Sequence, residues 1–313
     1  MFIRNLMSPQ VHSCRSEETL DVAARSMWEH DCGALPIVDA KGDPVGMLTD
    51  RDICMAAYTQ GKGLRDIRVA VAGSFPAYSV SADGPVRWAY AVMKLHRVRR
   101  LQVVDLGGNL VGVLSLADIA RRARHEVDPV DELDVEALAS TLVEVYRPHR
   151  CSNGAPVGRS PSCVAQVMTR EVRTCRPEDS LGHAAQIMWE ADCGCVPVVD
   201  PEGKPRAMLT DRDVCMAAYT RGVALGQMDV AGAASHRLVT VRESDALATA
   251  EQLMREYKIR RLPVVDASGK LAGILSMNDL VRRGYGPGHS HAVSAEGIVK
   301  TLAAVCEPPR ASA

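Results

Sequence analysis

The sequence predicts an α/β fold (α+β) made of four copies of one unit, each ordered helix, strand, strand and helix, with a short leading strand. Two observations support this prediction. The 313-residue chain matches itself when it is shifted by 161 residues, and each half matches itself when it is shifted by 66 residues. Within each copy, apolar residues recur first at helical spacing and then in short β-branched runs.

A stripe of apolar residues at positions i, i+3 and i+7 opens each unit and predicts a helix with one buried face. The four stripes are Leu20, Ala23 and Met27; Val86, Ala89 and Met93; Leu181, Ala184 and Met188; and Leu247, Ala250 and Met254.

Two strands joined by a tight turn are predicted after each of these helices. The first strand is a β-branched run that ends in Asp (PIVD, QVVD, PVVD and PVVD), and a turn containing Gly, such as AKGDP or ASGK, follows it. The second strand (VGMLT, VGVLS, AMLT or AGILS) leads directly into another helix. Short leading strands are expected near Val11, Tyr78–Val80, Val172 and Val239–Val241.

A unit of about 60 residues buries too little surface to be stable alone, so neighbouring units are expected to pair. We therefore expect module 1 at residues 1–125 (units 1–61 and 66–125) and module 2 at residues 163–285 (units 163–222 and 227–285). Residues 126–162 are expected to form a tail helix and a flexible linker rich in Pro, Gly and Ser, and residues 286–313 a C-terminal tail. Amphipathic stretches at 131–146 and 294–306 should pack on a module or on a partner chain.

Composition argues against several classes of protein. The 37 basic and 38 acidic residues nearly balance, so no global charge favours nucleic acid or an anionic membrane. The N-terminus lacks the apolar core of a secretory signal and no stretch is long enough to span a bilayer, so we expect a cytoplasmic protein. Six of the ten cysteines occupy equivalent positions amid small or apolar neighbours, which indicates buried free thiols.

A hydroxyl residue ends the second strand of every unit, and Asp follows three residues later. We call each such pair a corner. The four corners are Thr49 with Asp52, Ser115 with Asp118, Thr210 with Asp213, and Ser276 with Asp279. The pattern fits a helix-capping box, but it also fits an anion site, because a helix N-terminus presents free N–H groups and a positive dipole end.

Arginines favour the anion site, because a capping box has no need of them. Arg99 and Arg100 precede the first strand of the second unit, and Arg260 and Arg261 precede that of the fourth. A carboxylate can accept two hydrogen bonds from the cis hydroxyls of a ribose, while hydroxyl and guanidinium groups bind phosphate oxygens. The apolar strand residues can enclose a base, so the corners predict nucleotide sites.

These motifs resemble the cystathionine-β-synthase (CBS) domain family. The resemblance rests on GMLTDRD, GVLSLAD and GILSMND, on RRLQVVD and RRLPVVD, and on the 66-residue pairing, and it covers roughly residues 2–125 and 163–285. It implies two pseudo-twofold CBS pairs, or Bateman modules, each with two clefts. Such pairs commonly bind adenosine compounds, including AMP, ADP, ATP, S-adenosylmethionine and dinucleotides, and act as ligand sensors.

The resemblance also implies roles for individual residues. The residues expected to bind ribose are Asp52, Asp118, Asp213 and Asp279. Those expected to bind phosphate are Thr49, Ser115, Thr210, Ser276, Arg99, Arg100, Arg260 and Arg261. The chain departs from the family pattern at Ala207, which replaces a motif glycine, and at Gln102, which replaces a proline. Gly33-Ala34 and Gly194-Cys195 stand where the other repeats carry an arginine pair, which weakens the case for phosphate binding at Asp52 and Asp213.

One stretch is almost identical in the two halves: MLTDRDICMAAYT at 47–59 returns as MLTDRDVCMAAYT at 208–220. Our hypothesis is that Arg51 and Arg212, inside the corners, meet the arginine pairs at the centre of each module and bind phosphate. Recent duplication is the alternative explanation.

An enzyme is not predicted, because most of the nine histidines do not recur between the halves and no catalytic set emerges. A metal site at Cys193-Gly194-Cys195 would lack a second pair of ligands, and His289-Ser290-His291 is expected to be solvated in a linker rich in Gly. Two functions remain: a sensor that binds an adenine nucleotide and signals to an effector protein, or a scaffold whose corners only cap helices. The four repeats are expected to form a disc within one chain or across a homodimer.

Overall fold

The computed structural model describes residues 1–125, 134–147, 161–235, 237–285 and 292–307. The strands are β1 Cys14–Arg15, β2 Ala34–Val38, β3 Pro44–Thr49, β4 Ser79–Ser81, β5 Arg100–Val104, β6 Leu110–Ser115, β7 Cys195–Val199, β8 Pro205–Thr210, β9 Val241–Arg242, β10 Arg261–Val265 and β11 Leu271–Ser276. The helices are α1 Leu20–Glu29, α2 Asp50–Gln60, α3 Val69–Ala72, α4 Val86–His96, α5 Leu116–His125, α6 Val135–Val145, α7 Leu181–Glu190, α8 Asp211–Arg221, α9 Leu247–Tyr257, α10 Met277–Asp279 and α11 Ala295–Val305. The predicted order of helix, strand, strand and helix is confirmed in all four repeats.

Each repeat contains an antiparallel hairpin, formed by β2–β3, β5–β6, β7–β8 or β10–β11. The leading strands β1, β4 and β9 pair in parallel beside three of the hairpins, and in the third repeat Cys175 makes a single parallel bridge to Val198. The prediction of leading strands near Val11 and Val172 is wrong by about three residues. Gln10 and His12, beside Val11, line an open groove, and strand pairing starts only after them, at Cys14.

The predicted helical stripes are buried, except that Val86 is half-buried. The Asp that ends each first strand organises the turn of its hairpin. The carboxylate of Asp39, for example, accepts hydrogen bonds from the N–H groups of Lys41 and Asp43 at 2.8 and 2.9 Å. Gly42 in this turn has φ of +91°, a conformation that favours glycine.

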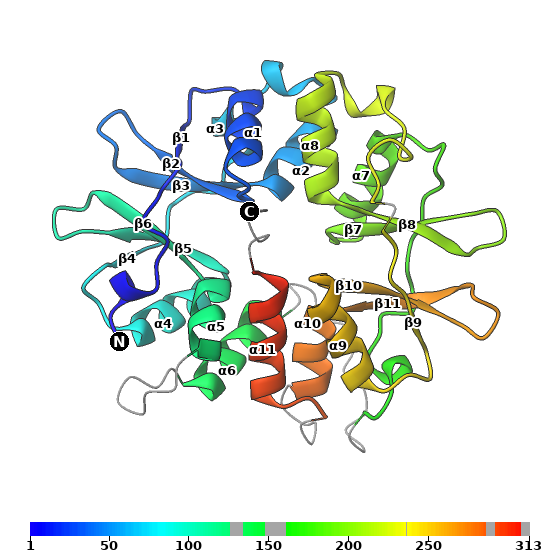
Figure 1. Ribbon diagram of the computed structural model, residues 1–313. Coiled ribbons are helices and arrows are strands. Elements are labelled where there is room, and N and C mark those ends of the chain that lie inside the picture. The colour runs from blue at the N-terminus through cyan, green and yellow to red at the C-terminus, as the bar shows by residue number, and fades with distance from the viewer. Residues whose placement is uncertain (126–133, 148–160, 236, 286–291, 308–313) are drawn as a thin grey trace, which may run out of the picture.

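The four repeats form a ring within a single chain (Figure 1). The first and second repeats lie on one side of the ring, and the third and fourth lie on the other. Helices α2 and α8 join the first repeat to the third, whereas α11 contacts α5, α6 and α9 and joins the second repeat to the fourth. Of the two arrangements considered from the sequence, the described chain therefore adopts the intramolecular disc.

Two hydrophobic cores stabilise this ring, and each core crosses from one module to the other. One core contains residues of the first and third repeats, including Ile53 of α2 and Val214 of α8. The other contains residues of the second and fourth repeats together with the tail helices, including Leu138 of α6 and Ile298 of α11. The amphipathic helices thus pack back on the chain itself. Residues 131–133 of the first predicted stretch, and most of the predicted linker, lie outside the described residues.

The cysteines at equivalent positions are free thiols in the described chain. Cys14, Cys54, Cys175 and Cys215 are buried as predicted, whereas Cys32 and Cys193 are only half-buried. Burial raises the pKa of the Cys14 thiol to about 12. No helix in the described ranges has both the length and the hydropathy needed to cross a membrane.

Candidate functional site

All four corners form the hydrogen bonds of a capping box. At the fourth corner, Asp279 Oδ2 accepts hydrogen bonds from the N–H and Oγ–H of Ser276 at 2.9 and 2.5 Å, and the Asp279 N–H donates to Ser276 Oγ at 3.2 Å. The same three bonds join Thr49 to Asp52, Ser115 to Asp118, and Thr210 to Asp213. Capping therefore involves only one carboxylate oxygen of every corner, Oδ2.

The second oxygen distinguishes the even-numbered repeats from the odd-numbered ones. Asp279 Oδ1 lies 3.2 Å from Arg282 Nη2 and 3.4 Å from Thr169 Oγ1, and Asp118 Oδ1 accepts a hydrogen bond from Arg121. Arg282 Nε is buried without a hydrogen-bond partner among the described residues. An acceptor on a bound molecule would satisfy this donor, so the fourth corner suits a ligand.

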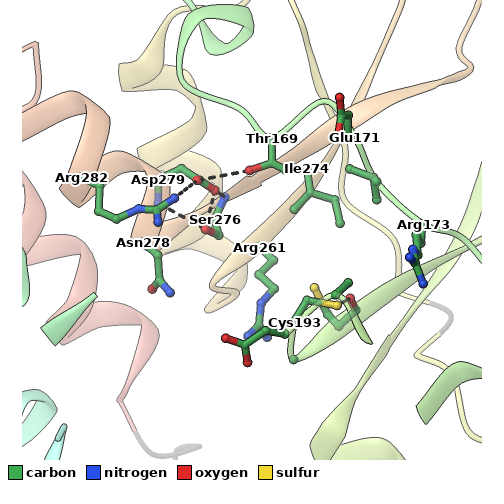
Figure 2. Close-up of a pocket in the computed structure, with 15 residues that line it drawn as sticks. Thr169, Glu171, Arg173, Cys193, Arg261, Ile274, Ser276, Asn278, Asp279 and Arg282 are labelled. Atoms are coloured by element: carbon green, nitrogen blue, oxygen red, sulfur yellow. Dashed lines mark hydrogen bonds and ion pairs between the residues drawn. The ribbon is translucent and has the colours of Figure 1, made fainter. Parts of the chain in front are cut away.

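The fourth corner opens into a pocket of about 350 Å³, which we call the outer pocket (Figure 2). Figure 2 shows Asp279 joined to Ser276, Arg282 and Thr169 at one end of it, with Arg261 extending towards Cys193. Both repeats of module 2 line this pocket. The lining residues are Thr169, Glu171, Val172, Arg173, Ala191–Cys195, Arg261, Ile274, Ser276, Asn278, Asp279 and Arg282. The outer pocket is therefore a cleft between paired repeats.

The equivalent position in module 1 is a wider groove of about 1300 Å³, which we call the outer groove. Asp118 and Arg121 line it, together with His12, His30 and Cys32. The two imidazole rings stack with centroids 3.3 Å apart, and burial, followed by the charge of His30, lowers the pKa of His12. Asp118 and Asp279 thus occupy equivalent positions in the two modules but have different neighbouring side chains.

A cavity of about 570 Å³ lies between the two modules, and we call it the central cavity. Nine cationic side chains line it, against three carboxylates. The cations are Arg51, Arg99, Arg100, Arg121, Arg212, Arg237, Lys258, Arg260 and Arg261, and the acids are Asp31, Asp50 and Asp211. Burial, followed by the charge of Arg99, lowers the pKa of Arg100. An anion is therefore favoured in this cavity.

Strand register explains how the arginine pairs reach the corners. Arg100 lies directly across the hairpin from Ser115, and Arg261 lies across from Ser276. Ala34 and Cys195 occupy the same position opposite Thr49 and Thr210 in the odd-numbered repeats. An arginine therefore faces the hydroxyl residue across the hairpin in the even-numbered repeats, whereas Ala or Cys faces it in the odd-numbered repeats.

The corner arginines do not meet at the centre of each module, so that part of the hypothesis is wrong. Arg51 Nη1 donates to the carbonyl oxygen of Cys193 at 2.8 Å, and Arg51 Nη2 to Asp192 Oδ1 at 2.9 Å. Arg212 of module 2 reaches module 1, where its Nη2 donates to Asp31 Oδ1 at 2.7 Å. Both side chains cross to the other module because α2 and α8 pack together, which brings the N-terminus of each helix to the opposing module.

Gly33 and Gly194 make room for this crossing. A β-carbon at Gly194 would lie 2.8 Å from Asp211 Oδ2 and 3.4 Å from Arg51 Nη1, and one at Gly33 would lie 3.2 Å from Arg212 Nη1. A larger residue would push these groups away. The glycines that replace the arginine pair in odd-numbered repeats thus permit contact between modules.

The structure brings together only some of the predicted site residues. The six arginines, Ser115 and Thr210 line the central cavity; Ser276 and Asp279 line the outer pocket; and Asp118 lines the outer groove. Asp52 borders a separate cavity beside Trp189, whereas Thr49 and Asp213 line none of these cavities. Gln102 is fully buried, donates to the carbonyl oxygen of Gly46 and leaves its Oε1 without a described partner.

Sequence reasoning missed several residues of the site. Arg121 and Arg282 stand three positions after Asp118 and Asp279, and comparison of the repeats could have revealed this shared spacing. Arg237, Lys258 and Cys306 gave no comparable signal, because they reach the central cavity only through tertiary packing.

No group of three or more potential metal ligands occurs among the described residues. Cys193 donates its thiol hydrogen to the carbonyl oxygen of Cys195 at 3.3 Å. His289 and His291, the other candidates, lie outside the described residues.

Comparison with known proteins identifies the family. The CBS domain model matches four stretches: residues 3–58, 71–125, 164–219 and 229–286. The chain belongs to the CBS domain family. The CBS domain-containing protein YhcV of Bacillus subtilis is 38% identical over 119 residues, which are 38% of this chain and 83% of that protein.

Hypoxic response protein 1 of Mycobacterium tuberculosis is 40% identical over 121 residues, which are 38% of this chain and 82% of that protein. A crystal structure from Methanocaldococcus jannaschii, described as a candidate archaeal homologue of γ-AMPK, has a TM-score of 0.61 and 16% identity. It covers 90% of this chain and 99% of its own. The fold of four CBS repeats is thus shared with that solved structure.

Proposed function

We propose that this CBS protein is a non-catalytic regulatory protein that binds an adenine nucleotide (AMP, ADP or ATP) and transmits its occupancy to a partner protein. The observation that carries the proposal is the central cavity, where arginines of both modules surround the hydroxyl corners of the second and third repeats. Guanidinium groups bind phosphate oxygens strongly, and attraction between charges is stronger where protein atoms replace part of the surrounding water. Capping requires none of these arginines.

Two side chains connect the proposed ribose sites to the proposed phosphate site. Arg261 lines both the outer pocket and the central cavity, and Arg121 lines both the outer groove and the central cavity. A nucleotide whose ribose diol binds Asp279 Oδ1 would displace Arg282 from that oxygen and direct its phosphates towards Arg261. The equivalent placement in module 1 would bind the ribose to Asp118 Oδ1, displace Arg121 from that oxygen and direct the phosphates towards Arg100.

Isothermal titration of the whole protein with AMP, ADP, ATP and S-adenosylmethionine tests the proposal. We expect micromolar binding of at least one adenine nucleotide and weaker binding at higher salt, because ionic attraction to the central cavity is screened. Tighter binding of S-adenosylmethionine than of any nucleotide would contradict the assignment to phosphate. Absorbance near 260 nm in the purified protein would independently reveal retained nucleotide.

The second candidate is a scaffold without a regulatory ligand. It is favoured by the complete capping boxes, since every corner carboxylate already accepts two hydrogen bonds from its own Ser or Thr. No measurable binding of the four compounds would select this candidate.

Arg51 should contribute to phosphate binding but not to base binding. Arg51→Ala is expected to weaken ATP binding about three- to tenfold through loss of one charged hydrogen-bond donor, while adenosine binding stays unchanged. Titrations with both ligands measure the difference. Arg65→Ala is the matched control, because Arg65 is exposed and its Nε lies 3.8 Å from Asp21 Oδ2, outside the lining of the central cavity. Equal losses for ATP and adenosine would show that Arg51 acts through the module interface alone.

A further inference from the structure

The C-terminal end of α11 reaches the central cavity. Figure 1 shows this helix running from the rim of the ring towards its centre. Ser294 caps its N-terminus by accepting a hydrogen bond from the N–H of Gly297 at 3.0 Å, and Ile298 and Leu302 are buried in the core shared by the even-numbered repeats. These contacts fix where α11 ends, and Val305 and Cys306 line the cavity.

The end of α11 contacts cations of both modules. Arg121 of module 1 donates to the carbonyl oxygen of Cys306 at 2.8 Å, and Arg260 of module 2 donates to Cys306 Sγ at 3.0 Å. Lys258 Nζ lies 3.5 Å from Glu307 Oε2. All three cations line the central cavity, so α11 engages three of its nine positive groups.

These contacts are those that an anion would make. The last carbonyl groups of a helix carry partial negative charge, and the Glu307 carboxylate adds a full charge beside them. The last turn of the other tail helix is arranged differently. Helix α6 ends at Val145, and the carboxylate of Glu144 in its last turn pairs with Arg147, just beyond the helix, at 2.9 Å. The acidic side chain at the end of α6 is thus paired within its own segment, whereas that of Glu307 contacts a cation that lines the central cavity.

We propose that the carbonyl oxygen and thiol of Cys306, together with the carboxylate of Glu307, act as a built-in substitute for an anion and compete with ligand phosphate for Arg121, Arg260 and Lys258. This inference rests on the proposed function, since it assumes that phosphate enters the central cavity. Phosphate binding would then release the end of α11 from these cations. Because α11 joins the second and fourth repeats, its end would report whether the cavity is occupied.

The Glu307→Gln variant tests the competition. We expect ATP affinity to rise about two- to fivefold, the range for an exposed ion pair, with no change for adenosine. Glu296→Gln is the matched control, because Glu296 lies at the opposite end of the same helix and pairs with Lys300. In a Lys258→Met background, Glu307→Gln should lose its effect. Unchanged or weaker ATP binding in the single variant would overturn the proposal.

Inorganic tripolyphosphate separates this inference from the proposed function. If nucleotides fail to bind but tripolyphosphate binds more tightly to Glu307→Gln, the inference stands and the proposed function fails. If nucleotides bind, and Glu307→Gln changes the affinity for neither ATP nor tripolyphosphate, the inference fails and the proposed function stands. If neither nucleotides nor tripolyphosphate bind, both fail. Hydrogen exchange at residues 302–307 should also increase on addition of tripolyphosphate, and unchanged exchange there contradicts the release of α11.

Discussion

Asp279→Ala should lower the affinity for the bound adenine nucleotide about 30- to 1000-fold. The reason is the loss of two hydrogen bonds from the ribose diol to a charged acceptor, together worth about 2–4 kcal/mol. Asp279 is 4% exposed, so water cannot readily replace these bonds. Titration of the variant with the best ligand of the wild-type protein measures the loss.

A structural role for Asp279 predicts a different result, because it also caps α10 through Ser276. Loss of a cap costs about 1 kcal/mol of stability, and it affects binding only indirectly. Asp266→Ala is the matched control, since Asp266 accepts turn hydrogen bonds from Ser268 and Lys270 in the same repeat, outside the lining of the outer pocket. A loss below threefold in Asp279→Ala would identify this carboxylate as a cap alone.

Ile298→Ala should lower the free energy of unfolding by about 2–5 kcal/mol, the range for truncating a fully buried aliphatic side chain. Ile298 is fully buried in the core that the second and fourth repeats share with α6 and α11. Because this core crosses between modules, we expect both modules to unfold in one cooperative transition. Chemical denaturation followed by circular dichroism measures both quantities.

Leu95→Ala provides the comparison, because Leu95 is 76% exposed on α4 and its truncation should change stability by less than about 0.5 kcal/mol. Two separate transitions in the wild-type protein would mean that each module folds on its own. Such a result would contradict a shared core.

The structure offers a physical reason for the repeated TDRD stretch. Its two copies face each other, since α2 packs on α8 and Arg51 and Arg212 make reciprocal contacts with Asp192 and Asp31. Longer contacts of 3.8 and 3.9 Å join Arg51 to Asp211 and Arg212 to Asp50. A change in one copy would therefore disturb the other copy as well as itself. The same residues border the central cavity, so interface and ligand site share these constraints.

The sequence by itself determined the repeats, their order of elements and the corners, because these features depend on local periodicity and short spacings. The stripe Leu20, Ala23 and Met27 is fully buried as predicted, and the hydroxyl and carboxylate of each corner meet because they lie only three residues apart. The strand register likewise follows from the hairpins, and it sets Arg261 opposite Ser276.

Only the tertiary structure decided which residues of different repeats meet. Arg51 reaches Asp192, 141 positions away, and Arg121 reaches Cys306, 185 positions away. Sequence spacing carries no information about such distances once two modules pack through their helices. The central cavity, and the end of α11 within it, arise from that packing, since each module alone supplies only part of the positive charge.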